Sequence, residues 1–174
     1  MKIAVYGASG YQAKLVLAEL SRRDIDAVLV GRNAGRLREA AASAGIADVE
    51  RQVADVDDHD TLVAAFRACD SVINCAGPFT PSGRRVVRAA IAAGCHYVDT
   101  AGEQLYIKSV FDTFSDDAER AGVTVIPAAN DACVGHRRSR CGCGRGCTRR
   151  STRRWRSRCG LGSSTAHSGR SVRP

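Results

Sequence analysis

Residues 3–13 read Ile-Ala-Val-Tyr-Gly-Ala-Ser-Gly-Tyr-Gln-Ala, and this stretch predicts a buried strand, a tight turn and the start of a helix. The glycines and the final alanine follow the spacing G-x-x-G-x-x-A. Gly7 permits the tight turn, Gly10 lets the backbone approach a bound group, and the small Ala13 lets the helix pack against the strand. The first N–H groups of such a helix have no partner within the helix and favour an anion.

The rest of the first 135 residues alternates between short apolar runs and stripes of helical spacing. Runs of this kind, apolar without strict alternation, are typical of strands covered on both faces. Alternation of strands and helices indicates right-handed βαβ units, so we predict an α/β fold with a doubly wound parallel sheet, the Rossmann NAD(P)-binding type. The expected strands are 3–6, 27–30, 51–53, 71–73, 96–98 and 123–126, with helical stripes at 13–20, 37–44, 62–69, 86–91 and 107–121.

The first turn is predicted to bind the pyrophosphate of a dinucleotide cofactor. The candidate contacts in this loop and the first helical turn are Gly7, Ser9, Gly10, Tyr11 and Gln12. The glycine pattern gains weight from its strand–turn–helix context. An ordinary tight turn between strand and helix is the alternative.

The end of the second strand bears on the choice of cofactor. NAD-binding domains place an acidic residue there to bind the ribose 2′-hydroxyl. This chain has Arg32 after Gly31, and a guanidinium pairs with a 2′-phosphate. We therefore favour NADP (NADPH) over NAD, with a solvated surface arginine as the alternative.

Two later strand ends add to the predicted cofactor site. Asp55 follows the third strand, where its carboxylate either accepts from the adenine amino group or serves as a turn residue. Cys75, Ala76 and Gly77 follow the fourth strand, beside the first strand at the switch point of the sheet. These small residues would let the backbone approach the nicotinamide ribose. A Gly-Pro turn that ends the strand is the alternative.

Four stretches resemble the saccharopine dehydrogenase-like proteins, which include the trans-acting enoyl reductases: GASGYQA at 7–13, VGR at 30–32, INCAGPF at 73–79 and GCHYVDTAGE at 94–103. The resemblance covers about residues 1–135. It implies an N-terminal NAD(P)-binding Rossmann domain, a longer substrate domain that is missing here, and hydride transfer to a C=C or C=N bond. A small-molecule or lipid-like substrate is implied for the intact family.

Candidate catalytic residues are few. Tyr97, Asp99 and Glu103 lie at the end of the fifth strand, where an acidic side chain could position substrate or move a proton. The alternative for Asp99 and Glu103 is that they cap the long helix that follows. The Tyr-x-x-x-Lys pattern of short-chain dehydrogenases does not occur at any of the four tyrosines.

The net charge of +8 is divided unevenly along the chain. Residues 1–135 carry 14 basic and 18 acidic side chains, whereas residues 136–174 carry 12 arginines and no acid. We therefore divide the chain into a Rossmann domain, 1–135, and an Arg/Gly/Ser/Cys-rich tail, 136–174. We favour a frameshifted or prematurely ended reading frame as the origin of this tail, which would leave a truncated protein with little activity.

The composition of the tail also allows other functions. A cofactor-sensing or nucleic-acid-binding module that uses the arginines is the alternative, although we do not expect nucleic acid as a partner. Its cysteines, C-x-C-x3-C-x11-C, lack the paired spacing of zinc sites, so we expect no metal. The sequence predicts no membrane span and a cytoplasmic protein, and it leaves a homo-oligomer open.

Overall fold

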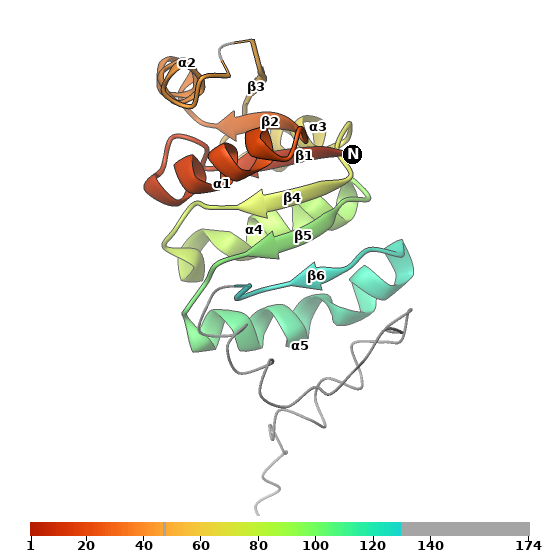
Figure 1. Cartoon of the computed structure of the whole chain (residues 1–174). Coiled ribbons are helices and arrows are strands. Elements are labelled where there is room, and N and C mark those ends of the chain that lie inside the picture. The colour runs from red at the N-terminus through yellow and green to blue at the C-terminus, as the bar shows by residue number, and fades with distance from the viewer. Residues whose placement is uncertain (47, 130–174) are drawn as a thin grey trace, which may run out of the picture. The chain divides into compact units, whose positions relative to one another are not determined.

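The structure is a computed structural model that describes residues 1–46 and 48–129 (Figure 1). Strands and helices alternate throughout this part of the chain, as the sequence predicts. The strands are β1 (Lys2–Tyr6), β2 (Asp26–Gly31), β3 (Glu50–Val53), β4 (Ser71–Asn74), β5 (His96–Asp99) and β6 (Val125–Ile126). The helices are α1 (Tyr11–Arg22), α2 (Ala34–Ser43), α3 (His59–Phe66), α4 (Phe79–Ala92) and α5 (Gln104–Ala121).

All the strand pairs are parallel, and the sheet order is β3-β2-β1-β4-β5-β6. The order runs outward in both directions from β1 and β4, which pair with each other in the middle. The predicted doubly wound parallel sheet is confirmed. Its topological switch point lies between the ends of β1 and β4, and ligands of such sheets bind outside the carboxyl ends of the strands at this point.

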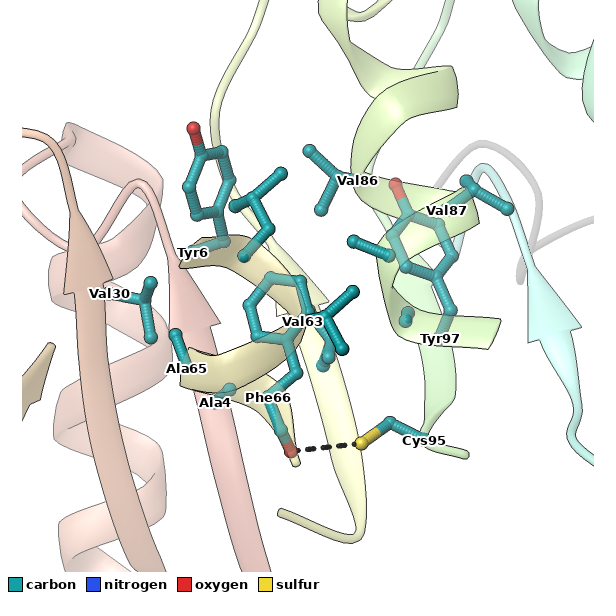
Figure 2. Close-up of a cluster of buried hydrophobic side chains, with 14 of the residues drawn as sticks. Ala4, Tyr6, Val30, Val63, Ala65, Phe66, Val86, Val87, Cys95 and Tyr97 are labelled. Carbon is teal, nitrogen blue, oxygen red and sulfur yellow. Dashed lines mark hydrogen bonds between the residues drawn. The ribbon is translucent and has the colours of Figure 1, made fainter. Parts of the chain in front are cut away.

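The sheet separates two hydrophobic cores. Alternate residues of β1 enter different cores: Ile3 and Val5 pack beneath α1 and α2, whereas Ala4 and Tyr6 pack against α3, α4 and α5. Figure 2 shows the second of these cores, where Phe66 and Val63 of α3 meet Val86 and Val87 of α4. Each face of β1 is therefore buried, which explains its unbroken apolar sequence.

The ends of the helices follow the chemistry of their sequences. Asp58 caps α3, where its side chain accepts from the N–H of Thr61. Gly122 ends α5 in the left-handed conformation, with φ +68°, and Gly94 follows α4 with φ +75°. Glycine is common at such positions because it adopts the left-handed conformation without strain.

The segment 136–174 lies outside the described residues, as do the hypotheses on its cysteines and arginines. Within the described part of the chain, no helix is both long and apolar enough to cross a membrane. The same residues contain no group of three or more His, Cys, Asp and Glu side chains arranged to hold a metal ion.

Candidate functional site

A cavity of about 350 Å³ opens at the carboxyl ends of β1, β2, β3 and β4. Its size is within the range of small-molecule sites, roughly 300–1,000 Å³. The wall contains two arginines, one carboxylate and several glycines, and it is lined by Tyr6, Gly7, Ser9, Gly31, Arg32, Asn33, Arg36, Leu37, Asp55, Val56, Ala76, Gly77, Pro78 and Ser82.

The glycine loop draws three strand ends together. Gly7 and Ala8 both donate their N–H groups to the carbonyl of Val30, at the end of β2. Gly7 has φ +76°, and a Cβ at this position would lie 2.8 Å from the Cβ of Ala76, which follows β4. Glycine is therefore required here both by the backbone conformation and by the approach of the β4 loop.

Helices α1 and α4 follow the two strands at the switch point, and their first turns differ. Gly10 is the N-cap of α1 and offers no side chain, so the first N–H groups of α1 remain for water or an anion. At the start of α4, the N–H groups of Phe79 and Thr80 donate to the carboxylate of Glu103, at 2.7 and 2.6 Å. Of these two helices, α1 is the one whose first turn has no side-chain acceptor.

The end of β2 carries two guanidinium groups. Arg32 and Arg36 both line the cavity, and neither forms an ion pair within the described residues. Asn33, the residue between Arg32 and α2, caps this helix by accepting from the N–H of Arg36. The cap brings the first turn of α2, and with it Arg36, to the cavity wall. Arg36 is absent from the sequence prediction, although its place in the first turn after Arg32 was a usable signal.

Asp55 makes a turn contact and also lines the cavity. One carboxylate oxygen accepts from the N–H of Asp57 at 3.0 Å, which is a turn contact. The same residue lines the cavity at the end of β3. A carboxylate that accepts a single backbone bond keeps free lone pairs for another donor.

The other predicted cofactor contacts fall into two groups. Gly7, Ser9, Arg32, Ala76 and Gly77 line the cavity together with Asp55. Outside its wall stand Gly10, Tyr11, Gln12 and Cys75.

The surroundings of Gln12, Tyr11 and Cys75 explain why these residues stand outside the cavity wall. Gln12 accepts from the Thr100 hydroxyl at 2.6 Å, and Tyr11 is exposed at the start of α1. Cys75 packs in the core beneath α1, where burial raises the pKa of its thiol to about 11.

Tyr97 and Asp99 are buried within the protein, at 1% and 0% exposure. One oxygen of the Asp99 carboxylate accepts from the hydroxyls of Tyr97 and Tyr106, at 2.9 and 2.7 Å. The other oxygen accepts from the N–H groups of Ala101 and Ala128, at 3.0 and 2.8 Å. Burial raises the pKa of Tyr97 and of Tyr106, so both hydroxyls stay protonated donors. The network joins β5, α5 and the segment after β6.

Asn74, at the end of β4, extends this network towards the cavity. Its side-chain NH2 donates to the Tyr97 hydroxyl at 2.9 Å, and its carbonyl oxygen accepts from the N–H of Ala76 at 3.0 Å. Because Ala76 lines the cavity, the buried network fixes one of the cavity walls. Asn74 is a further residue that the sequence prediction missed.

The expectation that Asp99 and Glu103 cap the helix after β5 is wrong. Glu103 precedes α5, yet its side chain makes no cap bond to that helix. It turns to α4 instead, where the Thr80 hydroxyl and the first N–H groups of α4 lower the pKa of its carboxyl. Asp99 is committed to the two hydroxyls and two N–H groups of the buried network. Caps between helices distant in sequence leave no local pattern, which is why the prediction failed.

A parallel sheet in the order 3-2-1-4-5-6, with a glycine loop at its switch point, defines a Rossmann domain that binds a dinucleotide. The family model of the saccharopine dehydrogenase NADP binding domain matches residues 3–126. The chain belongs to this family, as its sequence motifs indicate.

Individual relatives agree with this assignment. The chain is 32% identical over 130 residues to the trans-acting enoyl reductase of Mycobacterium tuberculosis (strain H37Rv), and 30% identical over 136 residues to the lipid droplet localized protein of Caenorhabditis elegans. Each match covers 72% of this chain, and 31% and 32% of these relatives respectively. The chain thus spans about a third of the length of the curated relatives it matches.

Among solved structures, the fold is similar to that of saccharopine dehydrogenase (L-Glu forming) from Saccharomyces cerevisiae in its apo form. The TM-score is 0.61 at 21% identity, and the match covers 74% of this chain and 27% of the yeast chain. At this identity the likeness supports the fold.

Proposed function

We propose that the domain binds NADPH in preference to NADH and that Arg32 and Arg36 recognise the 2′-phosphate. The observation that carries the proposal is the pair of cavity-lining guanidinium groups, without an acidic partner in the described residues, at the end of β2. A 2′-phosphate would pair with such groups, whereas the ribose hydroxyl of NADH would leave them without an anion.

The remainder of the cavity fits the rest of a dinucleotide. Gly7 holds the β1 loop against Ala76 with no side chain in between, which leaves backbone at the cavity surface. The uncapped first turn of α1 suits the pyrophosphate, because its N–H groups and the helix dipole both favour an anion. Asp55 remains able to accept from the adenine amino group, and Ala76 and Gly77 would face the nicotinamide half.

The proposal is tested by titrating NADPH and NADH into the full-length protein and its variants. Arg32→Ala should weaken NADPH by about 10- to 100-fold, since a charge-assisted hydrogen bond contributes about 1.5–3 kcal/mol. The same change should leave NADH within about twofold. Arg38→Ala is the matched control, because Arg38 is an exposed arginine of α2 outside the cavity wall. Equal losses for both cofactors in Arg32→Ala would refute the 2′-phosphate assignment.

For the whole protein we infer the transfer of a hydride from NADPH to a C=C or C=N bond of a small or lipid-like substrate. The inference rests on relatives named trans-acting enoyl reductase and saccharopine dehydrogenase-like oxidoreductase. The described residues would bind and orient the cofactor. They supply few groups for proton transfer, since Tyr97 and Asp99 are buried and Glu103 binds the start of α4.

The inference of hydride transfer has its own test. Consumption of NADPH, followed by absorbance, should depend on an added enoyl or imine substrate. Oxidation at the same rate without either substrate would contradict hydride transfer to these bonds, and it would leave the cofactor preference unaffected.

A further inference from the structure

Tyr6 is the last residue of β1 and stands directly before the glycine loop. Its ring belongs to the core formed by α3, α4 and α5, and only 7% of the residue is exposed. The ring packs edge-on against Phe66, with the ring centres 6.3 Å apart and the planes at 89°. Tyr6 is therefore held by its neighbours in a fixed place, and its hydroxyl has a defined direction.

The hydroxyl of Tyr6 points out of this core. Figure 2 shows it directed towards the carboxyl ends of the strands, away from Phe66 and Ala65. Tyr6 lines the cavity at that edge. The exposed part of this residue thus includes the polar end of the side chain.

No described residue makes a hydrogen bond with the Tyr6 hydroxyl. The tyrosines of the neighbouring network differ in this respect, because Tyr97 and Tyr106 both bind the Asp99 carboxylate. Because Tyr6 lines the cavity, its hydroxyl is available there to water or to a ligand. Phenylalanine would fill the same part of the core, so packing alone does not explain the hydroxyl.

The charges around the hydroxyl keep it a donor. Burial raises the pKa of Tyr6 to about 12, with a further contribution from the Asp55 carboxylate and an opposing one from Arg32. The group stays protonated at every physiological pH. Arg32 and Asp55, which follow β2 and β3, line the same cavity.

We propose that the Tyr6 hydroxyl donates a hydrogen bond to the adenosine diphosphate part of the cofactor, the part that NADP and NAD share. The proposal rests on the dinucleotide site proposed above and adds a specific contact to it. Position is the main reason, since Tyr6 directly precedes the loop that the pyrophosphate would contact. The contact contributes to affinity for either cofactor and leaves the choice between them to Arg32 and Arg36.

The test is the binding of ADP, NADPH and NADH to the full-length wild type and to Tyr6→Phe. Loss of one hydrogen bond of this kind should weaken all three by about three- to tenfold, with the NADPH-to-NADH ratio unchanged. ADP is the deciding probe, because it has neither a 2′-phosphate nor a nicotinamide. Tyr6→Phe should unfold at the wild-type temperature, since the hydroxyl has no partner in the described protein.

Tyr106→Phe is the control for the unfolding measurement. Its hydroxyl donates to Asp99 at 2.7 Å, so this variant, unlike Tyr6→Phe, should unfold at a lower temperature than the wild type. Wild-type affinity of Tyr6→Phe for ADP would overturn the Tyr6 contact and leave the proposed function standing. A lower unfolding temperature of Tyr6→Phe would also overturn it, by revealing a partner within the protein. A wild type that binds none of the three nucleotides would refute the proposed function and the contact together.

Discussion

Substitution of Gly7 by alanine tests the close approach of the β1 and β4 loops that shapes the cavity. Gly7 has φ +76°, a conformation that costs an L-residue roughly 1–2 kcal/mol. Its new Cβ would also lie 2.8 Å from the Ala76 Cβ and 2.9 Å from the Ala76 N. Backbone at that distance has to move, because it cannot rotate away as the end of a flexible side chain can.

The two costs can be separated within this chain. Overpacking costs about 1–3 kcal/mol, so Gly7→Ala should lower the free energy of unfolding by about 2–5 kcal/mol in total. Gly45 has nearly the same φ, +70°, and nothing lies within 4 Å of a Cβ built there. Gly45→Ala should therefore show the conformational cost alone, about 1–2 kcal/mol.

The measurement is urea unfolding of the full-length protein at 25 °C, followed by far-ultraviolet circular dichroism. Gly102→Ala serves as a second control, with a change within about 0.5 kcal/mol, because its Cβ would meet nothing and its φ lies outside the left-handed range. If Gly7→Ala were no less stable than Gly45→Ala, the contact with Ala76 would not constrain the loop. The account of the cavity wall would then be wrong.

Two further variants examine the acidic side chains near the site. The pKa of the Glu103 carboxyl is lowered below its ordinary value of 4.5. Its contribution to stability is therefore present above pH 4.5 and is lost as the pH falls through the lower folded-state pKa. The difference in unfolding midpoint between wild type and Glu103→Gln should accordingly shrink from about pH 6 to about pH 3. A constant difference over that range would contradict the cap on α4. Asp99→Asn replaces one carboxylate oxygen by an NH2 group, so either the two hydroxyl donors or the two N–H donors lose their acceptor. The variant should lower the free energy of unfolding by about 1–3 kcal/mol, against about 0.5 kcal/mol or less for Asp117→Asn, whose side chain is partly exposed. Equal midpoints for these two variants would count against the buried network.

The fold was predictable because its determinants are local or periodic. The residues 3–13 specify a strand, a turn and a helix, and the apolar stripes recur at spacings that only helices satisfy. Parallel order then follows from the alternation, and the family resemblance points the same way. The site residues that directly follow strands were also predictable, because parallel strands bring their carboxyl ends to one edge of the sheet. Arg32 and Asp55 line the cavity for this reason.

Contacts between distant segments were not predictable in the same way. Glu103 meets Thr80 across 23 residues, and Asn74 meets Tyr97 across the same separation. No sequence spacing marks these pairs, since they depend on the packing of α4 against α5 and of β4 against β5. Tyr6 was assigned to a strand, but the direction of its hydroxyl is decided by the ring of Phe66.

The correction at Glu103 bears on where an anion can bind. The starts of α1 and α4 follow the neighbouring strands β1 and β4 at one edge of the sheet, and each would attract a phosphate by the same dipole. A carboxylate already accepts from the first N–H groups of α4, and a second anion there would meet its negative charge. The first turn of α1 has no such acceptor, because Gly10 has no side chain. We therefore expect a cofactor phosphate to bind at the first turn of α1 rather than at the start of α4, where Glu103 already accepts.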